Sequence, residues 1–417
     1  MGAAITPEEK QIIEIIPTKS LTAYDFYQQV LEVYYRNPFP GTTPKTLRRM
    51  EELVYKALES DSTFAMAYSG LAGIYMAKNW NSKESYFNEN YLDSVLILAD
   101  KALSYDAHLD DAYLRRALYY NNTGNPEKAI IEFDRAINYN PNNWEAYRRK
   151  GSWVYLSSLY YSDYVKGLEC LHKAVSLNHS GELVAILQEL AYAYTYQAGF
   201  HEIGKKYYTE SFKLHGDTMI YLDDIGSLEI QYGEFDKGME KILKVYTKYP
   251  NNIWVAEKYF YHGQYEESLK YIMKVIERDR SSGNLMRRHD IIGYAYWKNG
   301  YKKEAEYWFN EQIRISKGAI KVGRYYSSSF DPNNAYYDLA GMYAFRGEKE
   351  KALEMLRKFD RCPVMSKSMV DDINNYNPLF NSIRNDPEFQ KIIISWEEKY
   401  QAEHEKVRNW LEEQEKL

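Results

Sequence analysis

Apolar and small residues recur along most of the chain at spacings of three and four, which is typical of amphipathic helices rather than strands. The clearest stretch is residues 111–141. Tyr113, Ala117 and Tyr120 follow an i, i+4, i+7 spacing and therefore share one helix face, and Gly124 ends that helix at a turn. A second helix repeats the spacing and stops at a proline: Ala129, Phe133, Ala136 and Pro141. The pattern predicts two antiparallel helices joined by a short turn.

This helical pair resembles the tetratricopeptide repeat (TPR), a motif of about 34 residues. The family places an aromatic, a small residue and an aromatic on its first helix, a glycine in the turn, and alanine, an aromatic and alanine on its second helix before a proline. All eight positions are present here without an insertion. The resemblance implies hairpins that stack on their neighbours into a right-handed superhelix with a concave and a convex face.

Copies of the unit recur from Tyr24 to Leu356, with strong copies at 292–309 and 339–356. The predicted fold is therefore all-α: a right-handed TPR superhelix of about nine helical hairpins with a C-terminal capping helix. The predicted organisation is an N-terminal lead segment (1–20), the solenoid (21–362) and a C-terminal linker with the capping helix (363–417). Insertions are expected near residues 79–90, 157–164 and 317–334.

The capping helix is predicted from an apolar stripe on an otherwise charged segment. The stripe consists of Phe389, Ile393, Trp396, Tyr400, Val407 and Trp410. A helix of this kind can shield the last hairpin from water, as terminal repeats require. The alternative is a dimerisation helix.

Two further segments carry a second resemblance. Asn377–Phe389 is similar to the tail that closes the TPR region of many bacterial adenylate cyclases, kinases and transcription regulators, and Pro17–Tyr27 is similar to the entry of the same regions. The resemblance implies the interaction or sensory part of a bacterial regulatory protein, whose DNA-binding or catalytic domain would lie outside these residues. No signature of such a domain is present in the sequence itself.

The composition narrows the range of functions. Of the 417 residues, 53 are Lys or Arg and 59 are Asp or Glu, a formal net charge of −6 that argues against direct nucleic-acid binding. A mean hydropathy of −0.62, with no apolar run of about 18 residues, argues against membrane insertion. A cytoplasmic location is expected, with the periplasmic half of a membrane-anchored regulator as the alternative.

Signatures of catalysis and metal binding are missing from the sequence. It contains no H-E-x-x-H, no phosphate-binding G-x-x-x-x-G-K-[ST] loop and no G-x-S-x-G elbow. Cys170, His172 and His179 form the one Cys/His grouping, and residues two apart on a helix point in different directions. We therefore expect no enzymatic activity, no cofactor and no metal.

The first helix of a TPR hairpin faces the concave groove, and aromatics interleaved with amides and charges there are suited to peptide binding. The predicted groove residues are Asn122, Arg148, Tyr155, Gln188, Tyr192, Tyr196, Asp223, Gln231, Tyr261, Asp290, Tyr294, Trp297 and Tyr337. The family's clamp for an acidic C-terminal tail requires Lys and Asn, where this chain has Leu114 and Leu118, so chaperone-tail binding is not expected.

The predicted function is a non-enzymatic scaffold that binds a protein or peptide of unknown identity, as a monomer or weak homodimer. One alternative is a module that senses a small molecule, such as a sugar or peptide, for a transcription regulator. The other is an oligomerising scaffold that uses the C-terminal helix.

Overall fold

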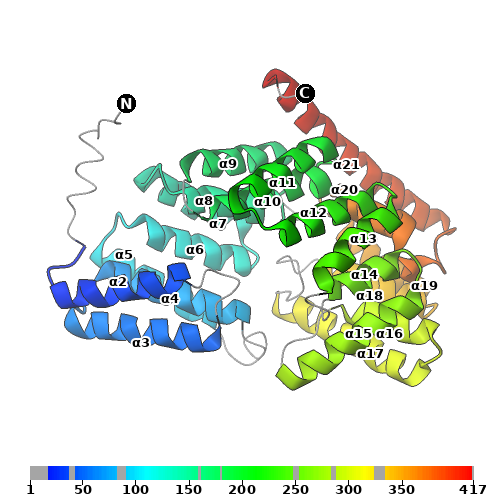
Figure 1. Cartoon of the computed structure of the whole chain (residues 1–417), viewed down its shortest axis with the longest axis horizontal. Coiled ribbons are helices and arrows are strands. Elements are labelled where there is room, and N and C mark those ends of the chain that lie inside the picture. Colours follow the sequence, from blue (N-terminus) through cyan, green and yellow to red (C-terminus); the bar gives the residue numbers. More distant parts are fainter. Residues whose placement is uncertain are drawn as a thin grey trace. The chain divides into compact units, whose positions relative to one another are not determined.

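A computed structural model describes residues 17–36, 43–81, 91–157, 161–178, 181–247, 253–282, 288–323 and 334–415. Every regular element in these ranges is a helix, and consecutive helices pack in pairs (Figure 1). The predicted all-α solenoid is thus confirmed. Contacts between residues divide the chain into two units, residues 1–121 with 128–143 and residues 122–127 with 144–417.

The first unit contains three helix pairs. Their bounds are α2 (Leu21–Arg36) with α3 (Pro44–Ser60), α4 (Ala65–Asn81) with α5 (Tyr91–Tyr105), and α6 (Asp110–Asn122) with α7 (Pro126–Tyr139). Tyr113, Ala117 and Tyr120 lie on α6, and Ala129, Phe133 and Ala136 lie buried on α7, as their spacing predicts.

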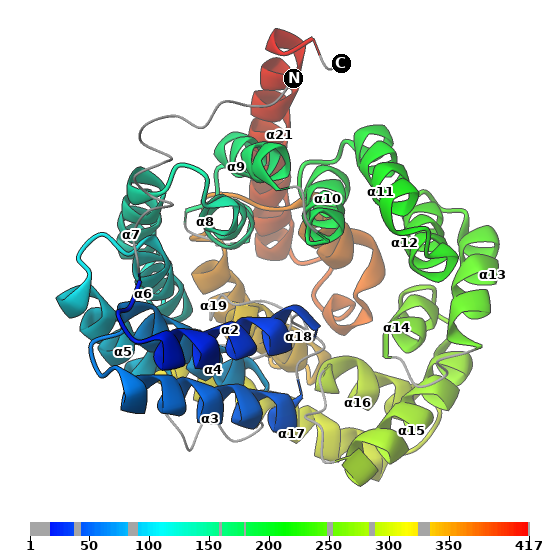
Figure 2. The same cartoon turned by 60° about the vertical axis from the view of Figure 1, so that its left-hand side comes forward.

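The second unit continues the pairing. Its helices are α8 (Trp144–Arg149), α9 (Tyr164–Leu177), α10 (Leu183–Tyr192), α11 (His201–His215), α12 (Thr218–Gln231), α13 (Phe235–Tyr246), α14 (Ile253–Tyr261), α15 (Tyr265–Ser282), α16 (His289–Lys298), α17 (Lys302–Val322), α18 (Asn334–Phe345) and α19 (Lys349–Phe359). Figure 2 shows α10, α14 and α16 on the inner side of a curved row, with α11, α13 and α15 outside.

Glycines end the first helices at the predicted turns. Gly233, Gly263, Gly300 and Gly347 have φ angles between 74° and 88°, which side chains with a Cβ rarely adopt. These four positions therefore hold the sharp turns that return the chain as the second helix of each pair.

Three wider turns interrupt this regular pattern. The π-helical turns η1 (Lys150–Tyr155), η2 (Ala193–Gln197) and η3 (Asp372–Tyr376) close hydrogen bonds from residue i+5 to residue i. The amide of Leu156 donates to the carbonyl of Gly151 at 3.0 Å, and that of Ala198 donates to Ala193 at 2.9 Å. Each turn inserts an extra residue, which turns the following side chains away from their ordinary helical positions.

The C-terminal segment crosses the second unit before its final helix. It contains α20 (Lys367–Asp371), η3, the short 3₁₀ turn η4 (Pro378–Phe380) and the long α21 (Pro387–Glu413). Arg384 donates from its guanidinium to the carbonyls of Ile373, Asn374 and Asn377 at 2.6–2.8 Å, which fixes the turns before α21.

α21 does more than the predicted capping. Its first half caps α18 and α19, because Phe389, Ile393 and Trp396 join the buried cluster of that hairpin. Its second half packs on α9 and α10 instead, where Val407 and Leu411 join the cluster of Leu168. The helix therefore connects the last hairpin of the second unit with its first ones.

Several predicted features fall on residues outside the described ranges. They are residues 1–16 of the lead segment, and residues 82–90, 158–160 and 324–333 of the three insertions.

The connecting role of α21 can be tested at its far end. Leu411 is fully buried, so Leu411→Ala should lower the free energy of unfolding by about 2–5 kcal/mol, measured by denaturant titration. Ile394→Ala, on the same helix but 57% exposed, is the matched control and should change it by less than about 0.5 kcal/mol. Equal losses for the two variants would contradict the packing of this end.

Candidate functional site

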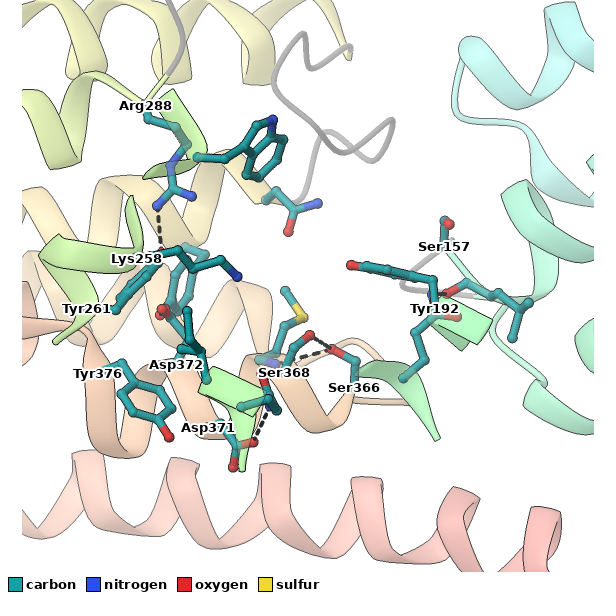
Figure 3. A pocket seen from close by; sticks show the side chains of 18 of the residues that line it. Ser157, Tyr192, Lys258, Tyr261, Arg288, Ser366, Ser368, Asp371, Asp372 and Tyr376 are labelled. Atoms are coloured by element: carbon teal, nitrogen blue, oxygen red, sulfur yellow. Dashed lines mark hydrogen bonds between the residues drawn. The ribbon is translucent and has the colours of Figure 1, made fainter. Parts of the chain in front are cut away.

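The second unit encloses a cavity of about 900 Å³ (Figure 3). Much of its wall comes from the first helices of the hairpins, α10, α12, α14, α16 and α18, and from the turn η1. Another part comes from the C-terminal segment, from Val364 to Tyr376, and further residues such as Tyr164, Phe235 and Gln312 come from second helices of the hairpins. The cavity is therefore the inner face of the hairpin row, narrowed by a piece of the same chain.

Polar contacts hold the C-terminal segment in this position. Ser366 caps α20 by accepting a hydrogen bond from the amide of Met369 at 3.2 Å. Gln231 on α12 donates to Asp371 at 3.2 Å, and Lys367 pairs with the same carboxylate. Met365 and Val370 are buried, so the segment is part of the folded unit.

Arg288 stands beside a cluster of four carboxylates at one end of the cavity. The acidic cluster consists of Glu257, Asp290, Asp338 and Asp372. The guanidinium lies 3.3 Å from Glu257 and 3.2 Å from Asp290, and donates to the hydroxyl of Tyr261 at 2.9 Å. Arg288 has a left-handed backbone (φ 60°), which is a strained conformation for a residue with a side chain. The three contacts offset the energetic cost of this conformation.

Two members of the acidic cluster have no cation of their own. Asp338 accepts a hydrogen bond from Gln312 at 3.1 Å, while Asp372 accepts from Tyr337 and, at 3.1 Å, from Asn377. Among the described residues, neither carboxylate has a Lys, Arg or His nitrogen within 4.0 Å. Burial, with Asp290 and Asp372 nearby, raises the pKa of Asp338 well above its usual value, and burial also raises the pKa of Asp372.

Two nitrogen-bearing side chains of the wall make no hydrogen bond within the described ranges. Lys258 extends its ammonium into the cavity in Figure 3, and burial lowers its pKa. His289 is 6% exposed and stacks on Trp308, with ring centroids 5.4 Å apart. Burial lowers the pKa of His289, which favours the neutral imidazole.

Five of the predicted groove residues line the cavity: Tyr192, Gln231, Tyr261, Asp290 and Tyr337. They come from five different first helices or helix ends, so the predicted groove face coincides with the cavity wall at these positions. Tyr192 is 51% exposed and its ring points inward in Figure 3.

The other predicted residues lie elsewhere. Tyr294 is 3% exposed and packs in the core with Phe260, and Trp297 lies against Phe345. Tyr155 is buried within η1. Asn122 is half-buried and absent from the cavity wall.

The remaining four contact other residues of the helical row. Arg148 pairs with Glu189 at 2.6 Å, and Gln188 donates to Asp224 at 3.4 Å. Tyr196 packs against Tyr192. Asp223 accepts from Tyr246 at 3.2 Å and lines a smaller cavity that shares Lys258.

Sequence reasoning missed Lys258, Arg288, His289, Asp338 and the whole C-terminal wall. Lys258 could have been predicted from the sequence, because it precedes the predicted groove residue Tyr261 by three positions and so shares its helix face. The C-terminal segment gave no signal, since residues 363–376 lack the periodicity of a repeat.

One family model matches the chain, that of the tetratricopeptide repeat, over residues 110–143. This stretch is the α6–α7 hairpin and the turn after it, and its neighbours repeat the same helix–turn–helix arrangement. The chain therefore contains a tetratricopeptide repeat (TPR). No curated protein matches this TPR protein in sequence.

Solved structures resemble the TPR protein at low identity. A human IFIT1 dimer with m7Gppp-AAAA is 14% identical, with 96% of each chain covered and a TM-score of 0.46. Pseudomonas aeruginosa PilF is 13% identical over 63% of this chain and 96% of its own, with a TM-score of 0.36. YrrB, described as a TPR protein with an unusual peptide-binding site, is 18% identical over 52% and 97%, with a TM-score of 0.29.

Two other features are absent from the described ranges of the TPR protein, a membrane-spanning helix and a metal-binding cluster. No helix there combines the length and apolar character that a membrane span needs. The same ranges hold no cluster of three His, Cys, Asp or Glu side chains arranged to bind a metal ion.

The electrostatic role of Arg288 is testable. Arg288→Met removes the cation beside the acidic cluster and should destabilise the TPR protein by about 3 kcal/mol at pH 8, measured by chemical unfolding. Because the pKa values of Asp338, Asp372 and Glu257 are raised, these groups bind protons more tightly when folded. The loss of stability caused by Arg288→Met should therefore be smaller at pH 5 than at pH 8.

Arg357→Met is the control, because Arg357 forms an exposed pair with Glu388. It should leave the free energy of unfolding nearly unchanged at either pH, because exposed ion pairs contribute little to stability. A deficit for Arg288→Met that does not change between pH 8 and pH 5 would rule out the charge explanation.

Proposed function

We propose that this TPR protein is a non-catalytic scaffold whose second unit binds a short peptide segment of a protein partner in the cavity. The observation that carries the proposal is the wall of the cavity: aromatic rings that remain accessible, placed among amides and hydroxyls, on the inner face of a rigid helical row. Tyr192 and Trp254 are each 51% exposed there, and Gln231, Ser366 and Ser368 line the same cavity.

These side chains meet the needs of a peptide ligand. Tyrosine and tryptophan rings supply contact area with little loss of side-chain entropy, and amides and hydroxyls pair with backbone N–H and C=O groups. The large row of helices fixes these groups before the ligand arrives, which lowers the entropic cost of binding.

The charge of the wall argues against phosphate-rich ligands. Glu189, Asp290, Asp338, Asp371 and Asp372 all line the cavity, against the two cations Lys258 and Arg288. A nucleic-acid backbone would be repelled by this balance of charge.

The size of the cavity supports a second candidate. A volume of about 900 Å³ falls in the range of small-molecule sites, so a sensing module for a small polar ligand is the alternative. A small ligand would raise the melting temperature in proportion to the logarithm of its concentration without any protein partner.

The C-terminal segment supports a regulatory setting. The stretch from Asn377 to Phe389, whose sequence resembles the closing tail of bacterial regulators, directly follows the part of the chain that lines the cavity. We propose that occupation of the cavity is sensed through this segment and α21, in the context of a bacterial regulatory protein.

Selection from a random heptapeptide display library on the immobilised full chain tests peptide binding. Tyr192→Ala combined with Trp254→Ala should reduce retention of the selected peptides at least about tenfold, since exposed aromatic anchors dominate such interfaces. The measurement is the dissociation constant of a synthetic selected peptide, by fluorescence anisotropy.

Tyr301→Ala combined with Tyr307→Ala is the matched control. These residues are 53% and 58% exposed but do not line the cavity, so binding should be unchanged. Failure to select any peptide, or equal losses for both double variants, would refute peptide binding in the cavity.

A further inference from the structure

At the Asp338 end of the cavity, carboxylates outnumber the cations that lie next to them. Arg288 is the cation within 4.0 Å of two cluster members, Glu257 and Asp290. The other two, Asp338 and Asp372, receive hydrogen bonds only from neutral groups. Carboxylates held partly away from water without a close cation are costly, and a ligand that supplies a positive charge would relieve that cost.

His289 points to the same kind of ligand by a separate route. Its imidazole is almost completely buried, lines the cavity, and has no hydrogen-bond partner within the described ranges. A neutral imidazole nitrogen accepts a hydrogen bond from an ammonium or guanidinium group. A buried polar group of this kind is normally paired, so its partner is expected to come from the ligand.

Tyrosine rings complete the surroundings of this end. Tyr261 and Tyr337 line the cavity beside the acidic cluster. Aromatic faces attract organic cations, and do so more strongly where water is excluded. Carboxylates, a neutral imidazole and aromatic rings together suit an organic cation.

We propose that the cavity recognises a basic side chain of the bound peptide, a lysine ammonium or arginine guanidinium seated against Asp338 and Asp372, with His289 on the same cavity wall. This inference rests on the proposed function and specifies its ligand. Lys258 acts on Glu257 within the cluster and on Asp223 outside it, and it forms no ion pair within 4.0 Å with Asp338 or Asp372 among the described residues. Its ammonium is placed to meet a carbonyl of the peptide backbone instead.

The charge of Asp338 should make binding depend on pH. Burial raises the pKa of Asp338 well above its usual value, and a bound cation favours its ionised form. Binding should therefore release protons, and affinity should fall as the pH is lowered from 7.5 to 5.5. The groups facing Asp338 from the surrounding elements are Glu257, Tyr261, Arg288, His289, Asp290, Gln312, Tyr337 and Asp372.

The library selection provides the first test. The selected heptapeptides should be enriched in Lys or Arg at one position. Peptides without such enrichment would overturn this inference and leave peptide binding intact, whereas selection of no peptide at all would overturn both.

A double-mutant cycle provides the second test. Asp338→Asn should weaken binding of a selected peptide about tenfold or more, by isothermal titration calorimetry, and replacing the basic residue of the peptide with norleucine should do the same. In the Asp338→Asn protein, that norleucine replacement should have little further effect. Independent, additive losses would overturn the proposed contact.

Asp371→Asn is the matched control, because Asp371 lines the same cavity but is already paired with Lys367. Its effect on affinity should stay within twofold. Thermal melts of both variants should show that Asp338→Asn does not lower the melting temperature. Titrations in two buffers of different ionisation enthalpy should detect proton release for the wild type, and its absence would contradict the cation site.

Discussion

The packing of α21 against two distant parts of the second unit is the constraint on which the cavity depends. A hairpin cannot bury its apolar faces alone and relies on its neighbours. Here the last hairpin covers one of its faces with the first half of α21, while the second half covers α9. Gly199 contributes to this contact, because a Cβ there would lie 2.2 Å from the hydroxyl of Tyr400. The C-terminal segment is thereby drawn across the inner face of the row.

Two features at the cavity are unfavourable for the stability of the fold. Arg288 keeps a left-handed backbone, and Asp338 and Asp372 are half-buried with no Lys, Arg or His nitrogen of the described residues within 4.0 Å. Neither feature is needed to stack hairpins, whose stability comes from apolar clusters such as that around Phe260 and Phe309. Local strain and unmatched charge in one place are more typical of recognition than of packing.

The sequence was informative where periodicity governs the structure. The spacing of Tyr113, Ala117 and Tyr120 predicted α6, and the same reasoning placed Tyr192, Gln231 and Tyr261 on the inner face. It was less informative where one residue of register matters. Tyr294 and Trp297 lie on a first helix as expected. Successive residues of a helix are rotated by 100° about its axis, so an error of one residue moves a side chain from the groove face to the core face, and Tyr294 packs in the core. The wall formed by residues 364–376 depends on contacts between segments far apart in the chain, which local patterns do not encode.

The link between α9 and α21 has a consequence for how the chain acquires its site during synthesis. The amide of Tyr164 donates to Glu403 across 239 positions of sequence, at 3.4 Å. Hairpins can assemble one after another as they leave the ribosome, because each depends mainly on the preceding one. The cavity wall, by contrast, is complete only when α21 has emerged and docked on helices made long before. A nascent or prematurely terminated chain can thus fold its repeats while still lacking the complete cavity, so the proposed recognition requires a finished molecule.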